Sequence, residues 1–111
     1  PFHVDVIKDR ASLGRVVDDG HVENTYRVHV LNTDTLAHGF AFTAQGLPGL
    51  QTRLSAPLAI AGTERGSATL NLVLPPDAAA PLRGRPQAVH ITVQRDDGVV
   101  VTVKASFFVP R

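Results

Sequence analysis

A chain of 111 residues with 43% hydrophobic and 19% charged residues has the size and composition of one globular domain, not of a disordered segment. Its 11 Lys and Arg against 10 Asp and Glu give a formal net charge of +1, too even a balance for a nucleic-acid-binding protein. There is no cysteine, which excludes disulfides, thiolate metal sites and iron–sulfur ligation by these residues.

The chain is predicted to be a single domain, residues 1–111, excised from a longer protein. It begins at Pro1 without an initiator methionine, and no signal peptide is recognisable. No run approaches the roughly 20 apolar residues that a membrane helix needs. We therefore expect no direct membrane insertion by this segment.

Apolar residues alternate with a period close to two along most of the chain, which favours strands over helices. Bounds can be given for six of the expected strands, which in chain order are residues 3–8, 22–32, 38–45, 67–74, 87–95 and 99–109. The last of them is long enough for a helix. Its Val-rich, strictly alternating sequence is typical of a strand instead.

Turn signals separate these segments. Asp18-Asp19-Gly20 and Asp96-Asp97-Gly98 predict tight reversals, because glycine accepts a positive φ. The second should join 87–95 and 99–109 in a hairpin. Gly46-Leu47-Pro48-Gly49 should end the strand before it, since proline cannot donate to a strand ladder. Residues 75–86 hold four prolines and predict a connection with at most one helical turn.

Seven or eight short strands without a real helix predict an all-β fold, an immunoglobulin-like antiparallel β-sandwich. The absence of a cysteine pair and of tryptophan indicates a variant without a disulfide. The predicted core consists of the inward-facing residues Tyr26, Val28, Val30, Phe42, Leu70, Leu72, Ile91, Val93, Val101 and Val103.

Histidines are the first candidates for metal chemistry: His3, His21, His29, His38 and His90. Zinc and copper sites favour close spacings such as H-x-H or H-x3-H, and none of these five lies within four positions of another. We therefore predict no metal site. His29 and His90 both occupy the polar faces of their strands, which leaves a chance surface pairing open.

Catalytic patterns are also missing. The serines lack a G-x-S-x-G elbow, and the paired aspartates adjoin glycines in turns, where aspartate normally bonds nearby backbone amides. The glycine-rich stretches 46–49 and 62–66 match no phosphate-binding pattern. The prediction is a protein that is not an enzyme and holds no cofactor in this domain.

A group of charged and polar residues gathers by sequence near the first turn: Asp9, Arg10, Arg15, Glu23 and Asn24. An arginine beside a carboxylate can form paired hydrogen bonds that tie one strand to the next. Asn24 can bond the backbone of an irregular segment. Two interpretations stay open for this group and for Gly46, Pro48 and Gly49: a structural brace, or a docking surface for a partner protein.

The order of these residues resembles the C-terminal immunoglobulin-like domain of the FixG/CcoG family. In that family the sequence of this region is typically V-x-R-D-R-N-x-L-Y-R, followed by D-G-x-I-E-N-x-Y, then a strand that ends in Asn, and then G-L-P-G. Lys8 replaces an Arg of this pattern, and Ala11 and Gly14 depart from its Asn and Tyr. The matching residues are Val6, Asp9, Arg10, Leu13, Arg15, Asp19, Gly20, Glu23, Asn24, Tyr26, Asn32 and Gly46 to Gly49.

The resemblance implies a membrane-bound, polyferredoxin-like accessory protein of cbb3-type cytochrome c oxidase assembly. In such a protein, 4Fe-4S clusters and membrane helices lie elsewhere in the chain. This domain would follow the last membrane helix on the periplasmic face of the bacterial inner membrane. Its partner would be the parent protein's membrane segment or an oxidase-assembly protein.

The function expected from these observations is a non-catalytic interaction or structural domain of that accessory protein. One alternative is a copper-handling domain that uses surface histidines. Another is an unrelated β-sandwich for adhesion or carbohydrate binding, although the aromatic surface platforms typical of such domains are not evident, with aromatic content at 5%.

Overall fold

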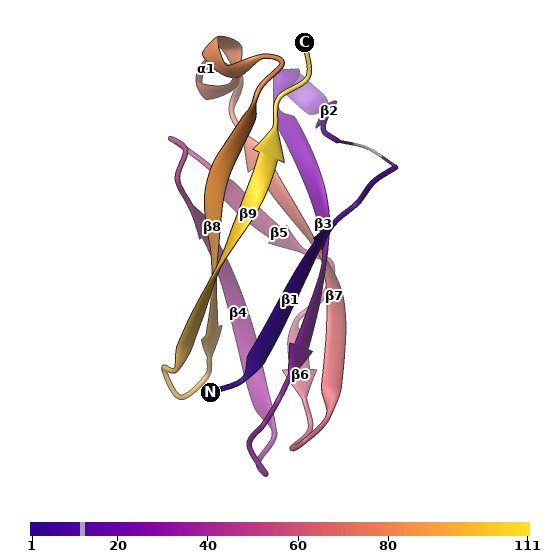
Figure 1. Cartoon of the computed structure of the whole chain (residues 1–111), viewed down its shortest axis with the longest axis vertical. Coiled ribbons are helices and arrows are strands. Elements are labelled where there is room, and N and C mark those ends of the chain that lie inside the picture. The colour runs from indigo at the N-terminus through magenta and orange to yellow at the C-terminus, as the bar shows by residue number, and fades with distance from the viewer. Residues whose placement is uncertain (12) are drawn as a thin grey trace.

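The structure, a computed structural model, describes residues 1–11 and 13–111 as two antiparallel sheets packed face to face (Figure 1). The strands are β1 (His3–Lys8), β2 (Arg15–Val16), β3 (Val22–Leu31), β4 (His38–Gln45), β5 (Gln51–Leu54), β6 (Leu58–Ile60), β7 (Arg65–Leu74), β8 (Pro86–Arg95) and β9 (Val100–Phe108). The first sheet has the order β1-β3-β7-β5, with β2 also paired to β3. The second has the order β6-β4-β8-β9.

The predicted all-β antiparallel sandwich is confirmed, and each predicted strand is present with ends shifted by at most two residues. The described residues form nine strands instead of seven or eight. The strands that sequence analysis missed, β2, β5 and β6, are two to four residues long. So few residues carry too little alternation to reveal a strand.

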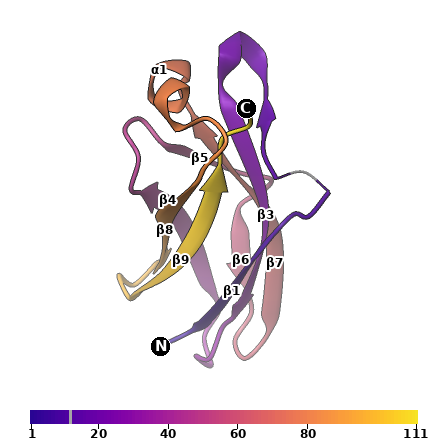
Figure 2. The ribbon, with the colours of Figure 1, turned by 45° about the horizontal axis from the view of Figure 1, so that its top comes forward.

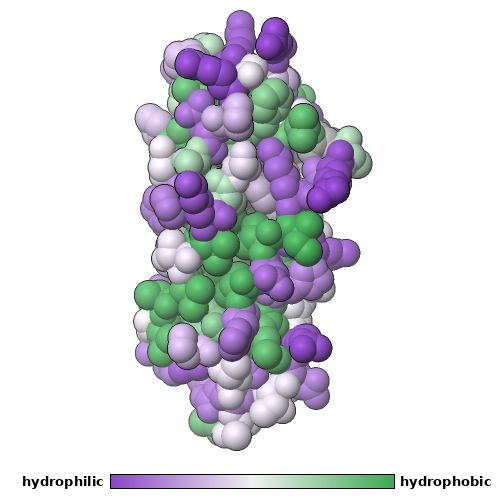
Figure 3. Space-filling model, viewed as in Figure 1, coloured by the Kyte–Doolittle hydropathy of each residue, from purple (hydrophilic) through white to green (hydrophobic). Residues whose placement is uncertain are grey.

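The core lies between the two sheets. The predicted core residues are buried except Val101 and Val103, which are half-buried because β9 is the outer strand of its sheet. At this side of the sandwich β1 and β9 pack against each other without pairing. Hydrophobic side chains gather over the middle of the face on which these two strands lie (Figure 3).

Two predicted turns position the strand ends. Gly98 has φ +94° and donates its backbone N–H to the Arg95 carbonyl at 2.8 Å, which closes the β8–β9 hairpin as expected. At the end of β4, the Leu50 N–H donates to the Leu47 carbonyl at 3.3 Å, and Gly49 has φ +73°. Pro48 and Gly49 thus occupy the two central positions of a type II turn, which favours these residue types.

The proline-rich connection contains one short helix, α1 (Pro76–Ala79), followed by a 3-10 turn, η2 (Ala80–Leu82). Proline at the start of α1 matches its preference for the first helical turn. None of the helices in the described residues is long and apolar enough to cross a membrane.

The molecule is elongated, with extents of 46 × 25 × 21 Å. Figures 1 and 2 show the N-terminus at one end, with the β3–β4, β6–β7 and β8–β9 turns, and the C-terminus at the other end, with α1 and the β2–β3 turn. We call these the Pro1 end and the Arg111 end.

Candidate functional site

Arg15 and Glu23 lie opposite each other in the β2–β3 hairpin. Nε and Nη2 of Arg15 donate to the same Glu23 oxygen, Oε1, at 2.9 and 2.6 Å. The predicted arginine–carboxylate contact is therefore present, although it uses one carboxylate oxygen. The Glu23 side chain is only 9% exposed and the Arg15 side chain is 65% exposed. Glu23 is occupied by this brace, whereas Arg15 also faces solvent.

Asn24 joins the two sheets. Its Nδ2 donates to the Phe108 carbonyl at 2.9 Å, and the Phe108 N–H donates to Asn24 Oδ1 at 2.8 Å. The side-chain amide thus pairs with β9 as a neighbouring strand would. The expectation that Asn24 bonds an irregular segment was wrong, because its partner is the last residue of a regular strand.

Tyr26 makes a second link of the same kind. Its hydroxyl donates to the Ser106 carbonyl of β9 at 2.7 Å. Burial raises the pKa of this hydroxyl, so it stays protonated and able to donate. Asn24 and Tyr26 are each 1% exposed. Together they satisfy outward-facing backbone groups of an edge strand, a row that would otherwise be open to another chain.

Gly14 packs directly on this link. A Cβ placed at Gly14 would lie 2.4 Å from the Phe108 carbonyl oxygen and 3.0 Å from Asn24 Nδ2. A side chain at this position, such as the Tyr of the family pattern, would require another path for the segment before β2. In the observed conformation, position 14 therefore has room only for a glycine.

The Gly46–Gly49 turn lies against a different part of the chain. A Cβ at Gly49 would meet Pro75 Cγ at 2.7 Å, and one at Gly46 would meet the Ala88 carbonyl oxygen at 3.2 Å. Between this turn and the α1–η2 segment lies a groove of about 660 Å³, here named the corner groove. Its lining is apolar apart from Asp77 and consists of Leu47, Pro48, Gly49, Pro75, Asp77, Ala78, Pro81 and Leu82.

Asp9 and Arg10 do not join the Arg15–Glu23 brace. Asp9 donates its N–H to the Thr25 carbonyl at 2.9 Å and accepts the Ala11 N–H on Oδ1 at 3.0 Å. Within the described residues, neither Asp9 nor Arg10 forms an ion pair with Arg15 or Glu23. The charged group expected as one cluster is thus divided between the end of β1 and the β2–β3 hairpin.

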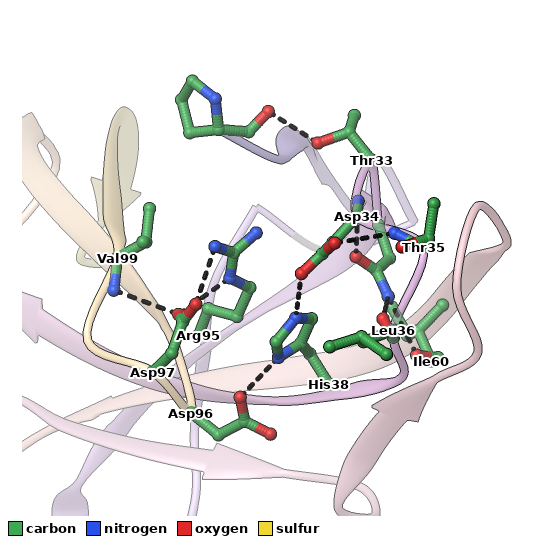
Figure 4. A network of polar contacts seen from close by, with 12 residues as sticks. Thr33, Asp34, Thr35, Leu36, His38, Ile60, Arg95, Asp96, Asp97 and Val99 are labelled. Carbon is green, nitrogen blue, oxygen red and sulfur yellow. Dashed lines mark hydrogen bonds and ion pairs between the residues drawn. The ribbon is translucent and has the colours of Figure 1, made fainter.

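A polar network that sequence analysis missed lies at the Pro1 end (Figure 4). His38 has Asp96 Oδ1 at 2.5 Å from Nδ1 and Asp34 Oδ2 at 2.6 Å from Nε2. Asp96 Oδ2 also accepts the Gly39 N–H at 2.8 Å. Asp96 was expected to bond a nearby amide, but its partners come from β4. The Asp34–His38 contact joins residues four apart, so the sequence could have suggested it. The contact with Asp96 depends instead on the pairing of β4 with β8.

The same network is the only place in the described residues where His, Asp and Glu ligand atoms gather closely enough to suggest a metal. His38, Asp96 and Asp97 offer such atoms within 4.8 Å of one another. Both ring nitrogens of His38 already have carboxylate partners, and Arg95 holds both Asp97 oxygens at 2.8 Å. We interpret the group as an ion-pair network that joins two turns.

The structure excludes a metal site shared by His29 and His90. His29 lies on the outer face of the first sheet and His90 on the outer face of the second. The core separates the two side chains, so they cannot share one metal ion.

A family model described as "IG-like fold at C-terminal of FixG, putative oxidoreductase" matches residues 1–110. The chain belongs to this family. The resemblance inferred from the sequence is thus confirmed, and so is the immunoglobulin-like fold of this FixG-family domain.

Two solved structures share the fold of the FixG-family domain. A FixG-related protein from Vibrio parahaemolyticus has 20% identity and a TM-score of 0.79, with 97% of this chain and 95% of that chain covered. The yeast GGA1 GAE domain has 13% identity and a TM-score of 0.52, with coverage of 96% and 90%. No curated protein sequence matches the chain.

The His38 network should make the stability of the FixG-family domain depend on pH. Hydrogen bonds to Asp34 and then Asp96 raise the pKa of His38 above its usual 6.5. The bond from His38 lowers the pKa of Asp34, and bonds from Gly39 and then His38 lower that of Asp96. The charge of nearby Arg95, itself paired with Asp97, opposes the shift at His38.

The His38 contribution is complete below the usual histidine pKa and is lost as pH rises through the raised value. The aspartate contributions are complete above about pH 4 and are lost on further acidification. The thermal midpoint should therefore be higher at about pH 5.5 than at about pH 8.5. His38→Gln should remove most of this difference, and His29→Gln, at an exposed site, should keep it. An unchanged pH profile in His38→Gln would contradict the assignment.

Proposed function

We propose that this FixG-family domain is a non-catalytic periplasmic module of a cbb3-type cytochrome c oxidase accessory protein. In this proposal it binds an oxidase-assembly protein through the corner groove and holds no cofactor of its own. The observation that carries the proposal is an apolar groove at the end of the sandwich remote from Pro1, built on the Gly46–Gly49 turn that belongs to the family pattern.

The polar part of the family pattern supports folding more than docking. Glu23 and Asn24 are buried and engaged within the domain. A partner cannot reach those groups without breaking the Arg15–Glu23 contact or the link between the sheets. Pro48 and Gly49, in contrast, are exposed and line the groove. Loops held by a rigid sandwich are a usual place for contacts with partners.

Position favours a separate protein over the parent's own membrane segment. In this proposal the domain follows the last membrane helix on the periplasmic side of the inner membrane. The chain enters the sandwich at the Pro1 end, and the corner groove lies toward the Arg111 end of a molecule 46 Å long. The groove then faces away from the membrane.

The lining indicates the chemistry of the occupant. Leu47, Ala78 and Leu82 present apolar surface, and exposed Asp77 is the one charged residue of the lining. An apolar segment next to a Lys or Arg complements this surface.

The test compares variants in two assays: the thermal midpoint of the isolated domain, and the amount of assembled oxidase in cells that carry the full-length protein. Pro81→Glu and Asp77→Arg alter exposed groove positions, and Thr43→Glu is an exposed control on the outer face of β4. We expect both groove variants to keep their midpoint and to reduce assembly, while the control retains both.

Two further variants separate docking from bracing within the charged group. Glu23→Ala should lower the thermal midpoint, because it leaves Arg15 without its carboxylate, and any assembly defect should follow that loss. Arg10→Ala, at an exposed site, should leave the midpoint unchanged. Normal assembly in both groove variants would refute the groove as a docking surface.

A further inference from the structure

The corner groove has a basic rim on the side where the α1–η2 segment ends. Arg83 follows Leu82, the last lining residue of that segment, and the Arg83 and Arg85 side chains are exposed. Nη2 of Arg85 donates to the Pro81 carbonyl at 3.2 Å. Because Pro81 belongs to the lining, this bond holds the Arg85 guanidinium beside the groove.

Arg111 lies against the same rim. The Gly84 N–H donates to the Val109 carbonyl at 2.7 Å, so residues 109–111 run beside the Arg83–Arg85 segment. A Cβ at Gly84 would lie 2.9 Å from Arg111 Cγ and 3.0 Å from Arg111 Nε. The Arg111 side chain therefore covers Gly84, the residue between the two other arginines.

These three guanidinium groups have no carboxylate partner among residues 1–11 and 13–111. The ion pairs formed there belong to Arg15, His38 and Arg95. An arginine matches a carboxylate with paired N–H donors, and an exposed guanidinium group keeps those donors available to a second molecule.

The opposite end of the same wall is acidic. Along the α1–η2 segment the lining passes from Asp77 through Ala78 and Pro81 to Leu82. Asp77 and Pro81 are four residues apart, which is about 6 Å along a helix axis. The groove thus offers a carboxylate at one end of an apolar wall and guanidinium groups at the other.

We propose that the corner groove binds an extended protein segment whose apolar residues stand between a Lys or Arg and an Asp or Glu. The basic residue meets Asp77 and the acidic residue meets Arg85, so that each charge of the segment lies beside its opposite. An extended chain advances about 3.3 Å per residue, which places the two charged residues about two to four positions apart. This inference rests on the proposed docking role of the groove and adds the acidic residue and its spacing.

The first arm of the test titrates the domain with four synthetic peptides that have blocked ends, and follows backbone amide chemical shifts. All four share a run of leucines. One peptide carries Lys before the run and Asp after it, two carry only one of these charges, with Gln or Asn in place of the other, and the last carries neither. We expect saturable shifts at residues 47–49 and 77–85. The doubly charged peptide should bind about two- to fivefold more tightly than either singly charged one, as an exposed ion pair implies.

The variant Arg85→Glu tests which residue reads the acidic end. The wild-type domain should prefer the peptide with Asp over its Asn counterpart, and Arg85→Glu should lose that preference. Arg65→Glu is the matched control, because it makes the same charge change at an exposed position where β7 begins, at the Pro1 end. This control should keep the preference for Asp.

The second arm uses the full-length protein in cells. Arg85→Glu should reduce the amount of assembled oxidase without lowering the thermal midpoint of the domain, and Arg65→Glu should change neither. Peptide binding that ignores the Asp, or no binding by any of the four peptides, overturns this inference even if Pro81→Glu impairs assembly. Normal assembly in Arg85→Glu beside impaired assembly in Pro81→Glu overturns it as well. Asp-dependent binding together with normal assembly in Pro81→Glu supports this inference about the ligand and refutes the role of the groove in oxidase assembly.

Discussion

Asn24→Ala is expected to lower the free energy of unfolding by about 2–4 kcal/mol. The substitution removes both hydrogen bonds to Phe108 and leaves its N–H and carbonyl, in a partly buried position, without partners. Each unsatisfied buried group costs about 1–3 kcal/mol, more than the net gain from an ordinary hydrogen bond. Urea unfolding of the isolated domain measures the change directly.

Asn71→Ala is the matched control for this experiment. Asn71 lies on β7 and accepts a hydrogen bond from the Thr25 hydroxyl at 2.7 Å, on the outer face of the first sheet. Water can replace that partner, so the control should cost less than about 1 kcal/mol. Equal losses in the two variants would show that Asn24 does not act as a link between sheets.

Ile91→Ala should destabilise the domain by about 2–5 kcal/mol, because it removes a large side chain from the centre of the core. Ile91 is fully buried, and its strand β8 lies between β4 and β9, where Ala44 and Val103 are its direct neighbours. Neighbours held in paired strands on both sides have little freedom to fill the cavity.

The same substitution at Ile7 is the control, since Ile7 is 54% exposed on the outer strand β1. Ile7→Ala should change the free energy of unfolding by no more than about 0.5 kcal/mol. The comparison holds the chemical change constant and varies only burial. A loss below about 1 kcal/mol at Ile91 would place this residue outside a tightly packed core.

The long strands and their faces could be predicted from the sequence because alternation is a local property. Phe40 and Phe42 in β4, and Val89, Ile91 and Val93 in β8, are buried as the period of two requires. Val101 and Val103 follow the same alternation, yet they are half-buried. Their exposure depends on β9 being an outer strand, and no local pattern carries that information.

In the candidate site, contacts between residues close in sequence could be predicted, whereas contacts between distant residues could not. Arg15 and Glu23 flank one turn, so their contact follows from a local hairpin. Asn24 and Phe108 are 84 residues apart, and His38 and Asp96 are 58 residues apart. The corner groove likewise requires the Gly46–Gly49 turn to meet the α1–η2 segment.

The sequence by itself determined the class of fold, the long strands, the turns that need glycine and the family to which the domain belongs. Each of these rests on spacing between neighbours along the chain. The tertiary structure decided which distant groups meet: Asn24 with Phe108, and His38 with Asp96. It also separated His29 from His90, because a strand's partner is chosen by burial of the whole sheet rather than by the residues beside it.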